Sequence, residues 1–192
     1  MLIITEEEVR QLLPMKECID VLDSAFREWD AGTVSNVARY RMPLVKGTHQ
    51  LMAAASHDIG ATGLKTYVTG TKGGSQMVVL LFDAETGQPI AILSANALGQ
   101  IRTGAASGLA TRYMAQEKAR SVGIIGSGYQ AQTQLEAVCA VRNIRRALVY
   151  SRSSEHRESF AKEMSARLGL EVAAVDSSDS AVAGVDVVCA IT

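Results

Sequence analysis

The sequence predicts an α/β protein in which an α+β N-terminal domain precedes a partial, doubly wound parallel sheet. Three patterns indicate this. Short apolar runs between glycine-rich and charged turns fill residues 39–93, a helical segment with very small side chains occupies 98–115, and strand and helix patterns alternate after Glu117. We therefore expect one domain at 1–117 and a second at 118–192.

Composition narrows the class of protein before any motif is considered. The 192 residues carry a formal net charge of −1 and 47% hydrophobic residues, an ordinary globular balance with no basic footprint for nucleic acid. The longest apolar run, MVVLLF at 77–82, is too short to cross a membrane, and no signal peptide is visible. Cys18, Cys139 and Cys189 are far apart, which predicts buried thiols, no metal site and a reducing cytoplasm.

Two helices are expected at the N-terminus. The first begins with a capping box, in which the Thr5 hydroxyl accepts from the Glu8 backbone N–H and the Glu8 carboxylate reaches back. It should stop near Pro14, which suits the first turn of the next helix. That second helix has one apolar stripe with three- and four-residue spacing and should end at Gly32.

A twisted, mostly antiparallel sheet should follow. The expected strands lie within RYRMPLV, HQLMAAAS, ATGLKTYVTG, QMVVLLFD and IAILSA, and DAETGQP at 83–89 reads as a turn between the last two. The helix at 98–115 then contains Gly104 and Gly108 in its interior. Because each costs about 1 kcal/mol relative to alanine in a helix, we expect another helix or a ligand to pack close to this backbone.

The last third alternates strand and helix, which predicts a parallel sheet with right-handed crossovers. Its first strand, SVGIIG, runs into GSGYQA, a G-x-G-x-x-A motif. Gly126 would make the tight turn, Gly128 would let a pyrophosphate approach, and Ala131 would let the helix pack on the strand. The free N–H groups near Tyr129 and Gln130 would face the phosphates. The pattern predicts a dinucleotide site of the Rossmann type; the alternative is a structural glycine turn.

The end of the second strand in this region bears on which dinucleotide is bound. An acid commonly stands there to hold the ribose 2′-OH of NAD, whereas this chain has Ser151 followed by Arg152. Serine and arginine can hold a 2′-phosphate, which an acid would repel. The residues therefore predict a preference for NADP over NAD, with a solvated loop arginine as the alternative.

Four basic residues in the N-terminal part could form an anion pocket: Lys65 in GLKTYV, Arg39 and Arg41 in ARYRMP, and Arg102 at the start of the small-residue helix. The simpler reading of any one of them is a solvated position at a sheet edge.

Taken together, the chain resembles the ornithine cyclodeaminase/mu-crystallin family along essentially its whole length. The resemblance rests on ARYRMP, GLKTYV, VVLLFDAETGQPIAIL, NALGQIRTGAASGLATRYMA and IIGSGYQAQ. It implies that the N-terminal domain binds substrate and forms a homodimer, while the Rossmann domain binds the cofactor.

The resemblance also implies roles for individual residues. Arg39, Lys65 and Arg102 match the residues that hold the substrate carboxylate, with Lys65 also a candidate for catalytic proton transfer and Arg41 the alternative to Arg39. The implied cofactor contacts are Arg102, Gly126, Gly128, Tyr129, Gln130, Ser151, Arg152 and Thr192. Family members with serine and arginine at the positions of Ser151 and Arg152 tend towards NADP.

The implied function is an NAD(P)-dependent oxidoreductase acting on a small amino acid or a cyclic imine, as in ketimine or pyrroline-2-carboxylate reductases and alanine dehydrogenases. The alternatives are an ornithine cyclodeaminase and a non-catalytic small-molecule binder. The catalytic aspartate of the family is expected beyond residue 192, and Asp176, Asp179 and Asp186 read as solvated or capping residues. We therefore expect a chain truncated within the Rossmann domain that shows no turnover alone.

Overall fold

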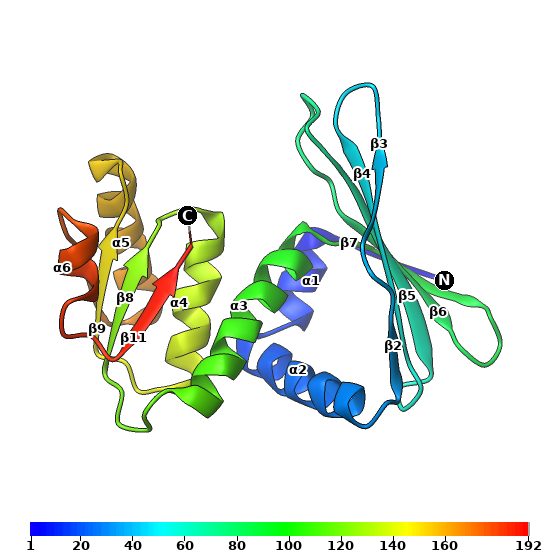
Figure 1. Ribbon diagram of the computed structural model, residues 1–192, viewed down its shortest axis with the longest axis horizontal. Helices are drawn as coiled ribbons and strands as arrows, with labels where there is room; N and C mark the ends of the chain where they lie inside the picture. The colour runs from blue at the N-terminus through cyan, green and yellow to red at the C-terminus, as the bar shows by residue number, and fades with distance from the viewer. Residues whose placement is uncertain (192) are drawn as a thin grey trace. The chain divides into compact units, whose positions relative to one another are not determined.

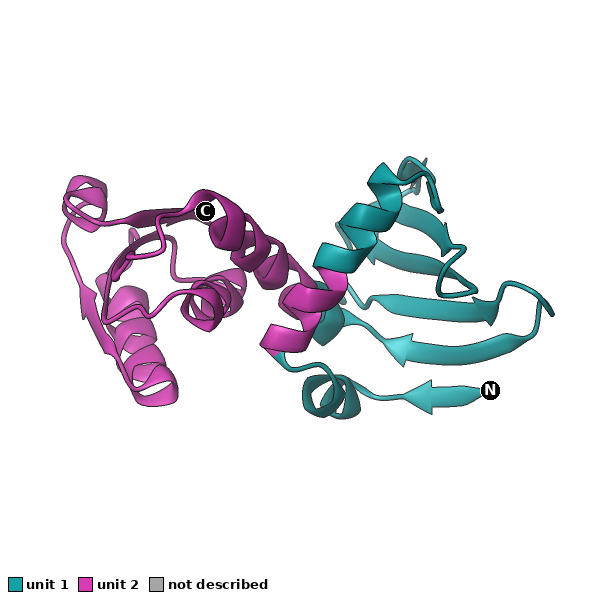
Figure 2. Ribbon diagram, turned by 90° about the horizontal axis from the view of Figure 1, so that it is seen from below, with its two compact units in different colours: residues 1–14, 23–99 teal, residues 15–22, 100–192 magenta. Residues whose placement is uncertain are grey.

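The chain divides into two compact units in the computed structural model, which describes residues 1–191 (Figure 2). The first unit comprises residues 1–14 and 23–99, and the second begins with 15–22 and resumes at Gln100. The expected domain boundary at 117–118 stays a prediction. The division by compactness falls inside α2 (Met15–Asp30) and α3 (Asn96–Met114), because the first turns of α2 and most of α3 pack within the second unit.

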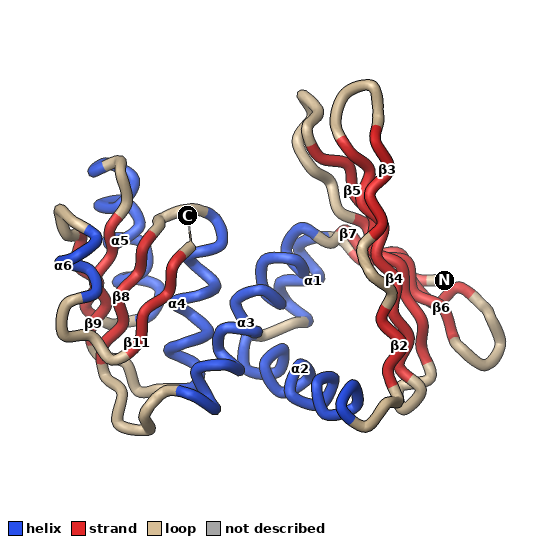
Figure 3. The backbone as a smooth tube through the Cα atoms, viewed as in Figure 1, coloured by secondary structure: helices blue, strands red, loops and turns tan. Residues whose placement is uncertain are grey.

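The first unit is built on a seven-stranded sheet (Figures 1 and 3), which confirms the expected mostly antiparallel arrangement. Its order is β1-β7-β6-β5-β4-β2, with β3 also paired to β4; β1 and β7 run parallel. The strands are β1 (Leu2–Ile4), β2 (Val34–Asn36), β3 (Tyr40–Pro43), β4 (Thr48–Ser56), β5 (Ala61–Thr69), β6 (Val78–Asp83) and β7 (Pro89–Ser94). The sequence did not predict β1 and β2, because three residues are too few to show alternation.

The two faces of this sheet differ. On one face, the Ser56 hydroxyl donates to the Glu28 carboxylate of α2 at 2.6 Å. The opposite face carries a row of residues that pair across four strands: Tyr40, Leu51, Thr66 and Val78. We call this row the open face, because Tyr40 is 63% exposed and Val78 is 38% exposed. Figure 1 shows α1 and α2 on the other side of the sheet.

The N-terminal helices begin and end where local chemistry requires. In α1 (Glu6–Leu12) the capping box is confirmed: the Thr5 hydroxyl accepts from the Glu8 N–H, and the Glu8 carboxylate accepts from the Thr5 N–H at 2.8 Å. Pro14 is the N-cap of α2 rather than part of its first turn. Helix α2 ends at Asp30, and Gly32 follows with φ of 79°, a left-handed conformation that favours glycine.

The second unit contains a four-stranded parallel sheet in the order β10-β9-β8-β11, which confirms the expected alternation. Its elements are β8 (Ser121–Ile125), α4 (Tyr129–Val141), β9 (Arg146–Tyr150), α5 (Ser154–Leu168), β10 (Glu171–Ala174), α6 (Ser178–Val182) and β11 (Val187–Ala190). The core is closed around Val122, Ile124, Leu135, Val149 and Met164, all fully buried. Numbered along the chain, the order is 3-2-1-4, which is typical of dinucleotide-binding sheets and reverses between β8 and β11.

The small-residue helix α3 packs against other helices, which explains its glycines. A Cβ atom at Gly104 would lie 2.7 Å from the Cβ of Thr133 on α4. A Cβ atom at Gly108 would lie 2.7 Å from Cδ1 of Ile19 and 3.0 Å from the Cβ of Ala137. Of the two expected partners, helix or ligand, the structure therefore shows a helix at both positions.

Candidate functional site

The glycine turn after β8 has two glycines with different requirements. Gly126 has φ of 112°, which favours glycine, and its N–H donates to the Tyr150 carbonyl at 2.7 Å. Gly128 has an ordinary φ of −83°, and a Cβ atom there would meet no protein atom within 4 Å. Neither the backbone nor a neighbouring residue therefore requires glycine at 128. Close approach of a ligand to the backbone would require it, so the residues present fit a nucleotide phosphate.

Helix α4 starts at this turn, and its N-terminus has the features of an anion site. Gly128 is its N-cap, no side chain caps it, and its first turn contains no acidic residue. The first N–H groups of a helix lack partners within the helix, and the positive end of the helix dipole favours an anion. Tyr129 and Gln130 are the first two residues of α4, as the motif predicts. This is the arrangement that binds phosphate groups at helix N-termini.

A hollow of about 320 Å³ adjoins the turn. It is lined by Ile125, Gly126, Ser127, Gly128, Tyr150, Ser151, Arg152 and Ile191. The structure thus brings four predicted cofactor residues together: Gly126, Gly128, Ser151 and Arg152. None of the lining residues is acidic. Thr192 lies outside the described residues.

Hydrogen bonds join the glycine turn to the end of β9. The Ser127 hydroxyl donates to the Ser151 hydroxyl at 2.8 Å, which donates to the Ser153 carbonyl at 3.1 Å. The Arg157 guanidinium donates to the Ser151 carbonyl at 3.1 Å and to the Asp176 carboxylate at 2.6 Å. The sequence analysis missed Ser127 and Arg157. A serine between the two glycines was a visible signal for the first, whereas only the fold brings the second to Ser151.

Gln130 and Arg102 are not among the residues that line this hollow. The Gln130 side chain lines a second space of about 560 Å³, together with Gln134, Thr103 and residues of β11. Its Oε1 atom is buried without a hydrogen-bond partner. Arg102 is exposed on α3, where its charge acts to lower the pKa of the Cys18 thiol while the larger effect, burial, raises it.

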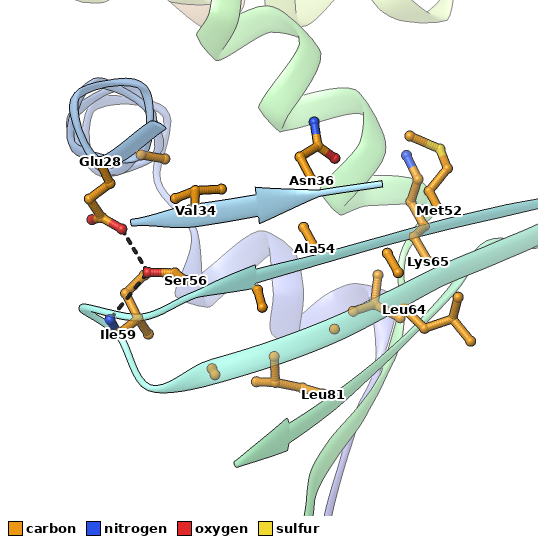
Figure 4. A pocket seen from close by; sticks show the side chains of 16 residues that line it. Glu28, Val34, Asn36, Met52, Ala54, Ser56, Ile59, Leu64, Lys65 and Leu81 are labelled. Carbon is orange, nitrogen blue, oxygen red and sulfur yellow. Dashed lines mark hydrogen bonds between the residues drawn. The ribbon is translucent and has the colours of Figure 1, made fainter. Parts of the chain in front are cut away.

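In the first unit, Lys65 borders an apolar pocket of about 490 Å³ (Figure 4). Lys65 lies on β5 between Met52 of β4 and Val79 of β6, and its Nζ atom is 5.7 Å from the centre of the Tyr67 ring. Small residues of β4 and β5 form much of its lining: Ala53, Ala54, Ala55, Ala61 and Gly63. The pocket is therefore an apolar surface with a cation at its border.

Two polar features of this sheet were missed by the sequence analysis. Glu28 and Ser56, which are hydrogen-bonded, also line the apolar pocket. Gln50 is 7% exposed, and its Oε1 atom is buried without a partner. Arg41 pairs with Gln50 and lies on the same face of the sheet as Lys65. Arg39 precedes β3 and is exposed. Arg39 and Lys65 thus belong to the first unit and Arg102 to the second.

The remaining cysteine, histidine and acidic residues that the structure describes are not gathered in a metal-binding group. Within residues 1–191 no group of three or more histidine, cysteine or acidic residues could hold a metal ion. Burial raises the pKa of the Cys139 and Cys189 thiols to about 11, which keeps them protonated and unreactive. In the same part of the chain, no helix is long and apolar enough to span a bilayer.

Comparisons with known proteins agree with this geometry. The sequence profile of the ornithine cyclodeaminase/mu-crystallin family matches residues 1–192. The Delta(1)-pyrroline-2-carboxylate reductase of Bacillus cereus is 32% identical over 200 residues, covering 100% of this chain and 62% of the relative. The Thermococcus litoralis Delta(1)-pyrroline-2-carboxylate reductase, solved with NADH and L-proline, has a TM-score of 0.92 at 34% identity, covering 99% of this chain and 61% of that one.

An archaeal alanine dehydrogenase dimer with bound NAD has a TM-score of 0.91 at 29% identity, covering 100% of this chain and 60% of that one. The chain therefore spans about three fifths of the length of these relatives.

Proposed function

Because this chain belongs to the ornithine cyclodeaminase/mu-crystallin family, we propose that the whole protein is an NAD(P)-dependent oxidoreductase acting on a small amino acid or its cyclic imine. The observation that carries this proposal is Gly128, a glycine that no protein contact requires, at the start of α4. A bound nicotinamide cofactor would supply or accept the hydride at the carbon next to a carboxylate. The relatives include reductases of cyclic imines and an alanine dehydrogenase.

The substrate part of the proposal assigns roles to three basic residues. Arg39, Lys65 and Arg102 bind the substrate carboxylate, with Arg41 the alternative to Arg39, and Lys65 also moves a proton. The position of Lys65 at the border of an apolar pocket supports its role, because the pocket could receive the body of a small organic acid. The exposure of Arg39 and Arg102 leaves both guanidinium groups able to reach a ligand.

For the cofactor, we propose a preference for NADP over NAD, with contacts from Arg102, the glycine turn, Tyr129, Gln130, Ser151, Arg152 and Thr192. The absence of an acid among the residues lining the hollow at the end of β9, together with the exposed Arg152, supports this preference. A 2′-phosphate held by Arg152 would gain a charge-assisted hydrogen bond of about 1.5–3 kcal/mol.

The test is a titration of the protein with NADPH and with NADH. We expect tighter binding of NADPH, and Arg152→Ala should weaken NADPH by about tenfold or more while changing NADH little. The control is Arg145→Ala, which removes an exposed arginine at the opposite end of β9. Equal affinity for the two cofactors would overturn the NADP preference, and failure to bind either would overturn the proposed function.

Turnover of the whole protein decides the reaction class. Oxidation of NADPH by a cyclic imine such as pyrroline-2-carboxylate is the expected result. Release of ammonia from ornithine without net cofactor reduction would instead identify a cyclodeaminase. Cofactor binding without turnover of any amino acid or imine would identify a binding protein.

The proposal includes a homodimer formed through the first unit, in a reducing cytoplasm. The open face supports the dimer, because half-exposed apolar residues on a sheet are available for a second copy. An archaeal alanine dehydrogenase of the same fold is described as a dimer. The three free cysteines, whose thiol pKa values are all raised by burial, support the location.

A further inference from the structure

Helices α3 and α4 are joined by side-chain hydrogen bonds in addition to their close backbone packing. The Gln100 side-chain amide on α3 donates to the carbonyl of Tyr129, the first residue of α4. In return, the Thr133 hydroxyl donates to the Gln100 carbonyl at 3.1 Å, and the Gln134 amide donates to the Thr103 carbonyl at 3.4 Å. The side chains that donate these three bonds are almost fully buried, with Gln100 only 2% exposed.

These bonds reach α3 on both sides of Arg102 along the chain. Gln100 lies two residues before Arg102, and Thr103 directly follows it. At their other end the bonds reach the first turn of α4, directly after the glycine turn. The Tyr129 carbonyl already has the Thr133 N–H as its partner in an α-helix. The Gln100 amide is therefore not needed to complete α4.

Helix packing alone does not call for this chemistry either. A contact between small apolar side chains would hold two helices together without burying amide groups. A buried amide group destabilises the fold when it lacks a hydrogen-bond partner. A directional bond between Gln100 and Tyr129 instead sets the rotation and register of α3 against the turn. That property matters where groups on two elements contact the same ligand.

We infer that Gln100 is a positioning residue, which fixes Arg102 relative to the Gly126–Gly128 turn through its bond to the Tyr129 carbonyl. The inference rests on the proposed function, in which Arg102 contacts the cofactor. It gives Gln100 a role in ligand binding without any contact between Gln100 and the ligand. Such positioning has large effects, because a misplacement of about 1 Å can reduce the rate of a reaction about 100-fold.

The test is a double-mutant cycle on NADPH affinity, measured by calorimetry. Gln100→Met removes the donor and keeps the length of the side chain, and Arg102→Leu removes the cation that it positions. We expect each single variant to weaken NADPH about tenfold and the double variant to be only about twofold weaker than either. The control is Gln132→Met, which removes an amide that donates from α4 to Glu163 on α5 at 3.2 Å; this variant should leave the affinity unchanged.

Additive effects in the cycle, or an equal loss of affinity in Gln132→Met, would overturn the inference while leaving the proposed function standing. Failure of the unsubstituted protein to bind either cofactor would overturn both. If Gln100→Met does not fold, Gln100→Glu replaces it, because it has nearly the same shape. When protonated, this carboxyl group can donate to the Tyr129 carbonyl, so NADPH affinity should recover as the pH falls. If the NADPH affinity of Gln100→Glu changed with pH in the same way as that of the unsubstituted protein, the inference would again be overturned.

Discussion

The two sheets of this chain are covered to very different degrees. In the second unit, three consecutive residues of β8, Val122, Gly123 and Ile124, are buried, and successive residues of a strand point to opposite faces. Both faces of that sheet are therefore closed by its own helices. In the first unit, all nine residues of β5 are only half-buried. The difference shows that the parallel sheet builds its core with its own crossover helices, whereas the antiparallel sheet keeps part of its surface exposed.

The largest effect should come from adding one methyl group to a glycine in each region. Gly104→Ala places a Cβ atom 2.7 Å from that of Thr133, whereas at Gly63 in β5 the nearest atoms would lie 3.5 Å away, an ordinary contact. We expect Gly104→Ala to lower the free energy of unfolding by about 1–3 kcal/mol through overpacking. Gly63→Ala should change it by less than about 1 kcal/mol. Denaturant unfolding followed by circular dichroism measures both.

A loss of stability in Gly63→Ala as large as in Gly104→Ala would contradict this contrast. It would mean that the first unit is packed as tightly as the second.

A charge on the open face should have the next largest effect, on association. Val78→Lys would place an ammonium group without a partner in the proposed dimer interface. We expect the dissociation constant of the dimer to rise by about tenfold or more. The control is Val45→Lys, at a fully exposed position between β3 and β4. Sedimentation velocity at several concentrations measures the association. A Val78→Lys dimer as tight as the unsubstituted one would exclude this face as the interface.

Acid should produce the smallest effect, through one hydrogen-bonded carboxylate in each unit. Hydrogen bonds from the Arg120 and Ser121 N–H groups and from the Ser121 hydroxyl lower the pKa of Asp186 below its ordinary 3.8. Hydrogen bonds from the N–H and hydroxyl of Thr86 lower the pKa of Asp83 in the same way. A lowered pKa in the folded state stabilises the fold above the unfolded pKa. That contribution is lost as the pH falls through the folded value.

Asp186→Asn should therefore flatten the decline in stability of the second unit below about pH 4, and Asp83→Asn should do so for the first unit. Hydrogen exchange at acidic pH measures the stability of each unit separately. A steeper acid decline in either variant than in the unsubstituted chain would contradict the sign. The two carboxylates also stabilise different kinds of contact. Asp83 closes a local turn, whereas Asp186, directly before β11, binds the backbone at the start of β8.

Local interactions explain which parts of the fold could be predicted. The capping box of Thr5 and Glu8, the turn at 83–89 and the glycine turn each depend on residues within a few positions of one another. Their chemistry is therefore visible in the sequence. The alternation after Glu117 likewise predicted the parallel sheet, because the crossover helices α4 and α5 are long enough to show their own pattern.

The tertiary structure decided the features that depend on distant residues. Strand β1 is recognised only by its parallel pairing with β7, and the Glu6 carboxylate accepts from the Asn96 N–H of α3 at 2.8 Å. Arg157 reaches the Ser151 carbonyl only because α5 returns along β9. Gln100 could not be identified from its neighbours in the chain, because a buried amide has no periodic signature. The sequence by itself determined the glycine turn and the type of ligand that it fits; the packing of α3 on α4 determined which residues hold that turn in place, because hydrogen-bond partners far apart in the chain are chosen by the fold.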